Sequence, residues 1–144
     1  MGQFEYLMGL VSIIMGLGIA SLLQGAAALL RTRHANGYWV HSLWLLTFLV
    51  WHVGVWALRW ELRDTPSWTV GQILIFLLVP VLLFLLSDLL FPEGSDEAGK
   101  DLKAYYFDNA ASFFGVSAVL CLAVAWTQVA FFPSPNVSTD IVVP

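Results

Sequence analysis

Two histidines and an arginine are the residues of this chain best suited to chemistry, and they lie in an otherwise apolar stretch. His41, His52 and Arg59 fall within YWVHSLWLLTFLVWHVGVWALRW, residues 38–60. At about 100° per residue of an α-helix, these three positions lie within about 20° of one another. Because a charge that faces lipid costs several kcal/mol, we expect this face to turn inward, toward a neighbouring helix.

Neutral imidazole is a good iron ligand, so the two histidines are candidate ligands of haem b. Their separation of eleven residues corresponds to about 16 Å along a helix, which would place two haems at different depths. No other long apolar segment contains a histidine, so bis-histidine ligation would require two copies of the chain. A quinone stacked on the nearby tryptophans is a related electron-carrier hypothesis. The simpler interpretation is that His41 and His52 are buried and hydrogen-bonded without a cofactor.

The sequence lacks the usual motifs of enzymes and metal sites. It has no HExxH, no GxSxG and no phosphate loop, so we expect no catalytic residue. A single cysteine, Cys121, cannot form a disulfide or a cysteine-based metal site within one chain. No basic run or basic–aromatic patch is present, so nucleic acid is not an expected partner.

The composition excludes a soluble globular domain. Hydrophobic residues make up 59% of the chain and charged residues 11%, with a mean hydropathy of +0.79. A soluble protein needs more charged surface than this. A helix of about 20 apolar residues crosses the roughly 30 Å of hydrocarbon in a bilayer. We therefore expect an integral membrane protein that contacts the lipid bilayer.

Four segments are long and apolar enough to cross: residues 4–30, 38–60, 69–91 and 109–132. Backbone groups in lipid must be satisfied within each segment, and the apolar runs do not alternate as barrel strands do. The predicted fold class is all-α, a polytopic membrane protein with a four-transmembrane-helix bundle over residues 1–132. Residues 133–144 are rich in proline and polar groups and predict a disordered tail. Residues 64–67 predict a turn with a helix cap, and Pro80 should kink its helix and free a carbonyl.

The distribution of lysine and arginine predicts the orientation. The first and third connections contain four basic residues, which are Arg31, Arg33, Lys100 and Lys103. The second connection is flanked by two, Arg59 and Arg63. The positive-inside rule therefore places both termini outside the cytoplasm, in a bacterial-type inner membrane.

The first segment has two faces of small residues. One stripe, with Glu5 at its start, contains Gly9, Ser12, Gly16, Ala20 and Ala27. Small residues let two helices approach closely, so we expect this stripe to pack against the histidine face of the second segment. Gly18 and Gly25, on the far side, form a second surface that is available to another neighbour or to self-association.

Depth along the spans predicts which polar groups meet. Glu5 and Arg59 lie near the outer ends of antiparallel helices, so we expect an ion pair between them. Near the inner end, His41, Gln24 and Asp88 lie at comparable depth, although Asp88 could instead extend to the lipid head groups. Together with His52, these groups form the predicted buried polar network.

These features favour a non-catalytic role. In size and helix count the chain resembles the small multidrug-resistance proteins, which are dimers with a glutamate inside the first span. Glu5 lies at the very end of its segment instead, so a small-solute transporter is the second alternative, after the electron carrier. The expected function is that of an accessory or scaffold subunit in a homo-oligomer or a larger membrane complex.

Overall fold

The computed structural model describes residues 2–31, 39–91 and 102–131, and their regular structure is entirely helical. The predicted tail at residues 133–144 lies outside the described residues. The elements follow one another as α1 (Gln3–Arg31), α2 (Trp39–Leu58), the 3₁₀ helix η1 (Arg59–Asp64), α3 (Val70–Leu89), α4 (Leu102–Asp108) and α5 (Ala110–Phe131).

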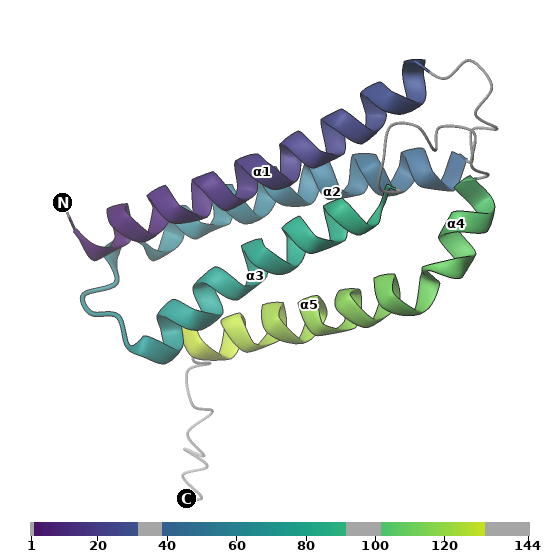
Figure 1. Ribbon diagram of the computed structural model, residues 1–144. Helices are drawn as coiled ribbons and strands as arrows, with labels where there is room; N and C mark the ends of the chain where they lie inside the picture. The colour runs from purple at the N-terminus through teal and green to yellow at the C-terminus, as the bar shows by residue number, and fades with distance from the viewer. Residues whose placement is uncertain (1, 32–38, 92–101, 132–144) are drawn as a thin grey trace, which may run out of the picture.

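The four long helices pack side by side as a bundle, and consecutive long helices run in opposite directions (Figure 1). α3 is the central helix, with its most extensive contacts to α1 and α5, while α2 packs mainly against α1. The start of α1, η1, the start of α3 and the end of α5 lie at one end of the bundle (Figure 1). We call this the η1 end; α4 lies at the opposite end.

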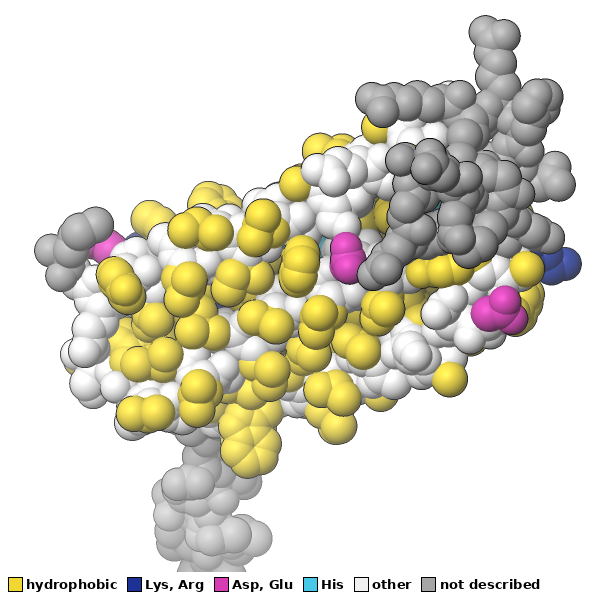
Figure 2. Space-filling view, viewed as in Figure 1, with side chains coloured by type: hydrophobic (Ala, Val, Ile, Leu, Met, Phe, Trp, Pro, Cys, Tyr) yellow, Lys and Arg dark blue, Asp and Glu magenta, His cyan; other side chains and the backbone are white. Residues whose placement is uncertain are grey.

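Each long helix can cross a membrane by its length and composition. The four candidate spans are Gln3–Ala28, Trp39–Asp64, Val70–Leu89 and Ala110–Phe131. Hydrophobic side chains cover the visible face of the bundle along α1, α3 and α5 (Figure 2). Such a surface suits contact with acyl chains and not with water, so the predicted four-helix fold class is confirmed.

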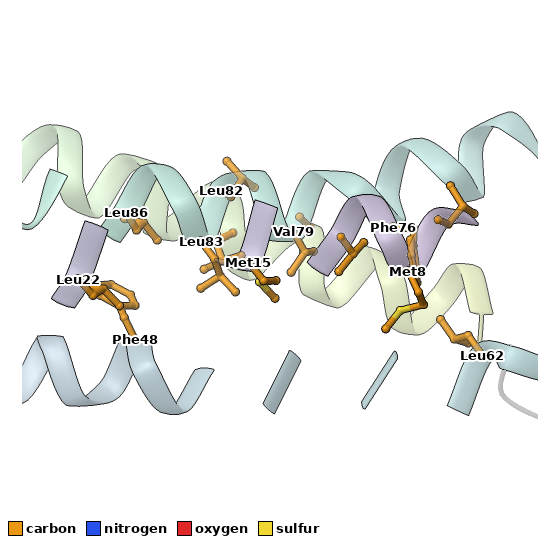
Figure 3. Close-up of a cluster of buried hydrophobic side chains, with 14 of the residues drawn as sticks. Met8, Met15, Leu22, Phe48, Leu62, Phe76, Val79, Leu82, Leu83 and Leu86 are labelled. Carbon is orange, nitrogen blue, oxygen red and sulfur yellow. The ribbon is translucent and has the colours of Figure 1, made fainter. Parts of the chain in front are cut away.

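The core contains apolar side chains of all four long helices, including a row between α1, α2 and α3. Met8, Met15 and Leu22 of α1 follow one another along this interface, and Leu83 of α3 packs into the same layer (Figure 3). Val11 and Leu22 are fully buried, at 0% exposed. This packing holds α2 and α3 at fixed positions relative to α1, and so positions the polar groups that they carry.

The cap that starts α3 lies later than predicted. Thr69, and not a residue of 64–67, is the N-cap: its side chain accepts a hydrogen bond from Gln72 N, and its own backbone N–H donates to Gln72 Oε1 at 3.0 Å. This Thr-x-x-Gln arrangement is a capping box, which satisfies two free donors at the helix start. It fixes where α3 begins at the η1 end.

Candidate functional site

The inward face of α2, continued into the start of η1, contains the residues singled out for chemistry. His41, His52 and Arg59 are only 2%, 0% and 7% exposed, respectively. Phe48, on the same face, is 3% exposed, whereas Trp39 on the opposite side is 71% exposed. The helical periodicity therefore identified the face of α2 that packs against the other helices.

His52 is fixed by α1 on one side and by its own helix on the other. Its Nδ1 lies 2.7 Å from the Phe48 carbonyl oxygen, which makes Nδ1 the hydrogen-bond donor. Its Nε2 has no hydrogen-bond partner and lies against Gly18, in the space that a methyl group there would occupy. The backbone of α1 thus closes the approach to Nε2, and no gap remains for a haem.

His41 lies at the other end of the same face. Its ring meets the edge of the Phe91 ring, with centroids 5.1 Å apart, and the Leu90 backbone is close by. Among the residues that the structure describes, neither ring nitrogen has hydrogen-bond geometry with a partner. The void beside the ring is about 10 Å³, room for about one water molecule. The geometry at both histidines therefore disagrees with haem ligation.

Arg59 forms its hydrogen bonds with backbone carbonyls. Its Nη2 donates to the Phe76 oxygen of α3 at 2.7 Å, and its Nη1 donates to the Val55 oxygen at 3.4 Å. The guanidinium carbon also lies 4.7 Å from the centre of the Phe76 ring, a cation–π distance. One residue of α3 thus provides both an oxygen and an aromatic face to the cation.

The Phe76 carbonyl is available because of Pro80. Pro80 is inside α3, four residues after Phe76, and proline has no N–H to donate to the carbonyl of residue i−4. Pro80 and Phe76 are both fully buried, so a free carbonyl there would lack water as well. Arg59 supplies the missing donor, and this bond links η1 to α3.

The predicted Glu5–Arg59 ion pair is not formed. Glu5 is exposed at the start of α1 and accepts a hydrogen bond from Gly2 N at 3.1 Å. Within residues 2–31, 39–91 and 102–131 the ion pair present joins Arg63 to Asp64, at 3.4 Å. The prediction of this ion pair used only the depth of Glu5 and Arg59 along their spans. In the structure, Arg59 donates instead to the Phe76 carbonyl of α3, which lacks its helical donor.

The remaining members of the predicted network lie at the surface of the bundle. Gln24 and Asp88 are both exposed. Asp88 does bridge two helices, because it accepts a hydrogen bond from the Ser21 hydroxyl of α1 at 3.3 Å. His41, His52 and Arg59 are therefore buried without forming a continuous network with Glu5, Gln24 and Asp88.

The two small-residue faces of α1 point in directions opposite to those predicted. Gly18 and Gly25 pack inside the bundle, where a methyl group would overlap His52 and Phe91, respectively. A methyl group at Gly9 or Gly16 would meet nothing within 4 Å. Residues Ser12 and Gly16 are exposed, and Ala20 and Ala27 are half-buried. The stripe expected to cover the histidines thus points out of the bundle.

Two polar contacts between helices did not follow from helical periodicity. Trp56 Nε1 donates to the Ser12 hydroxyl at 3.1 Å, which ties α2 to the edge of the open face of α1. Gln72 Nε2 donates to the Ala130 oxygen at 3.4 Å, which ties α3 to α5. The capping box at Thr69 could have identified Gln72, but each partner depends on how the helices cross.

The described residues contain no group of three or more His, Cys, Asp or Glu side chains that could hold a metal ion. No family model, no characterised protein and no solved structure matches this chain. The features of the molecule that bear on its function are therefore the chemistry of Arg59 and the surfaces that the bundle leaves open.

Proposed function

We propose that the protein is a non-catalytic membrane subunit that associates with a second copy of itself through the open face of α1, around Gly9, Ser12 and Gly16. The contrast between the two faces of this helix supports the proposal. On the inner face, glycines make room for His52 and Phe91. On the open face, no atom of the described residues lies within 4 Å of the position that a methyl group on Gly9 or Gly16 would occupy.

The glycines on the open face of α1 lower the stability of the helix. A glycine inside a helix is about 0.5–1 kcal/mol less stable than an alanine. Gly9 and Gly16 incur this cost without a compensating contact inside the bundle. Their spacing of seven residues repeats on one face and suits two helices that cross at about 20°. Close approach of another helix would provide the missing contact.

The test is the oligomeric state of the protein in mild detergent, measured by light scattering after size exclusion. We expect a defined oligomer for the wild type and a monomer for Gly16→Leu, because the larger side chain holds the helices apart. Gly115→Leu is the matched control, since Gly115 is also exposed and also has open space around it, but on α5. A monomeric wild type, or equal effects of the two substitutions, would refute self-association.

Co-purifying proteins distinguish a second copy from a larger complex. A different membrane protein that is retained with the wild type and Gly115→Leu, but lost from Gly16→Leu, would make this chain an accessory subunit of that protein. An absorption spectrum of the same sample tests the electron-carrier alternative. A Soret band that His52→Ala removes would replace the present proposal.

The proposed location is a bacterial-type inner membrane, with the η1 end outside the cytoplasm. The bias of lysine and arginine toward the first and third connections supports this orientation. The test uses a Cys121→Ala background with one new cysteine at exposed Ser67 or at exposed Lys103. An impermeant thiol reagent added to whole cells should label position 67 and not 103. The reverse pattern would invert the topology.

A further inference from the structure

A cavity of about 430 Å³ lies at the η1 end beside Arg59, between the end of α2, η1, α3 and α5. Its apolar walls include Val55 of α2, Val79 of α3 and Val124 of α5. Thr127 adds a hydroxyl on the α5 side. Binding sites for small molecules typically measure about 300–1,000 Å³ and combine apolar walls with a few polar groups. The cavity has both properties.

The cavity arises because different side chains fill the space between α2 and α5 at its two ends. Near α4, the Phe113 ring lies edge-on to Trp44 and Phe48, with centroids 5.1 Å and 5.9 Å apart. Toward the η1 end, the facing positions are Val55 and Val124, which line open space. Large rings close the gap at one end, and small side chains leave it open at the other.

Arg59 brings a buried positive charge to this cavity. It is 7% exposed, and its Nε is buried without a hydrogen-bond partner in the described part of the chain. Its two hydrogen bonds go to neutral carbonyl oxygens, those of Val55 and Phe76. A buried cation is stabilised most by an anion that accepts its remaining N–H groups, and the planar guanidinium suits carboxylate and phosphate oxygens in particular.

Among the described residues, Glu61 is the carboxylate that lines the cavity together with Arg59. It is exposed, and the ion pair seen among the described residues is the one between Arg63 and Asp64. Water screens the charge of an exposed carboxylate much more than that of a buried guanidinium. The potential inside the cavity is therefore set mainly by Arg59.

The location of the cavity defines the shape of its ligand. The exposed charged groups of η1, including Glu61, Arg63 and Asp64, mark the polar boundary at this end of the bundle. Arg59, the first residue of η1, lies next to that boundary. Val79 of α3 and Val124 of α5 lie further from the η1 end, toward the middle of the bundle. A molecule that fills the cavity needs a negative group at the boundary and an apolar part that extends toward the bilayer centre.

We propose that this cavity binds an anionic amphiphile with one acyl chain, whose carboxylate or phosphate group accepts hydrogen bonds from the terminal guanidinium N–H groups of Arg59 that the Val55 and Phe76 carbonyls leave free. The acyl chain lies against Val55, Val79 and Val124. A volume in the lower part of the range for small-molecule sites fits one chain and not two. The bond from Arg59 to Phe76 holds the guanidinium in place before the ligand arrives.

The test is equilibrium binding of radiolabelled palmitate to the full chain in nanodiscs of uncharged lipid. We expect saturable binding of one molecule per chain, and affinity at least roughly tenfold lower for the methyl ester, which lacks the charge. Arg59→Gln should remove this preference, so that acid and ester bind equally. Arg63→Gln is the control, because Arg63 lies in the same 3₁₀ helix and is exposed.

A second pair of variants tests the cavity without touching the charge. Val124→Phe should fill the space and reduce palmitate binding at least roughly tenfold, because overlapping atoms exclude the chain. Val119→Phe, at an exposed position of the same helix, should bind as the wild type does. This pair remains informative if Arg59→Gln fails to fold. Equal loss in both variants would overturn the proposal.

Competition against palmitate identifies the source of the anion. Lysophosphatidylglycerol that displaces palmitate at lower concentration would assign the site to a phosphate head group, and the reverse would assign it to a free fatty acid. Both results support an anionic amphiphile. Equal binding of palmitate and its methyl ester to the wild type, or displacement by inorganic phosphate as effective as by either amphiphile, would overturn it.

Discussion

The hydrogen bond between Arg59 and Phe76 makes a prediction about Pro80. Pro80 leaves the Phe76 carbonyl without its helical donor, and Arg59 Nη2 replaces that donor at 2.7 Å. We therefore expect Arg59 and Pro80 to be energetically coupled although they do not bond to each other. The perturbation is a double-mutant cycle with Arg59→Met and Pro80→Ala.

The magnitude follows from the groups left unpaired. Arg59→Met removes a charge-assisted hydrogen bond and a cation–π contact and leaves the buried Phe76 carbonyl unsatisfied, a loss of about 2–4 kcal/mol in the free energy of unfolding. With alanine at position 80, the backbone N–H satisfies that carbonyl. Arg59→Met should then cost about 1–2 kcal/mol less. The desolvation of the guanidinium occurs in both backgrounds and cancels in the cycle.

The assay is reversible unfolding in mixed detergent micelles, with the helical circular dichroism signal followed as denaturing detergent is added. Each of the four proteins gives a free energy of unfolding, and the difference between the two Arg59→Met losses is the coupling. Arg63→Met provides the matched control, because it should show no coupling to Pro80→Ala. A coupling for Arg59 below about 0.5 kcal/mol, the usual limit for independent sites, would refute the proposed exchange of donors.

The helix contacts make two further predictions for the same unfolding assay. Gly18→Ala should lower stability by about 1–3 kcal/mol because the methyl group overlaps His52, whereas Gly115→Ala, at an exposed position of α5, should be neutral or slightly stabilising; equal effects would contradict the packing of Gly18 against His52. Thr69→Ala should cost about 1 kcal/mol by removing the cap that Gln72 N binds, and an unchanged stability would show that α3 starts without it.

Much of the fold follows from the sequence because lipid restricts the choices. A span must satisfy its own backbone groups, so length and apolarity alone define the four helices. The burial of His41, His52 and Arg59 follows from the same physics, since these are the groups least compatible with acyl chains. Such a rule indicates which face of α2 turns inward, but it says nothing about what lies opposite.

The same rule does not identify which face of α1 turns inward. The inner face is a regular repeat at intervals of three and four residues: Phe4, Met8, Val11, Met15, Gly18, Leu22 and Gly25. In a water-soluble helix a polar opposite face would make such a stripe obvious, but the residues around it on α1 are nearly all apolar. Glycine content alone cannot rank the two faces, because close helix contact and open space both tolerate glycine.

The sequence did not indicate the hydrogen-bond partner of Arg59 for a related reason. Both parts of the contact are visible in the sequence: an arginine on a buried face and a proline that frees a carbonyl four residues earlier. What joins them is the angle at which α2 crosses α3, which depends on the packing of the whole core. Depth along the span indicated Glu5 instead, yet a carboxylate at a helix start can remain in water, whereas the buried Phe76 carbonyl cannot. In a membrane bundle, the acceptor that has no alternative partner is therefore a better guide to the position of an arginine than the nearest opposite charge.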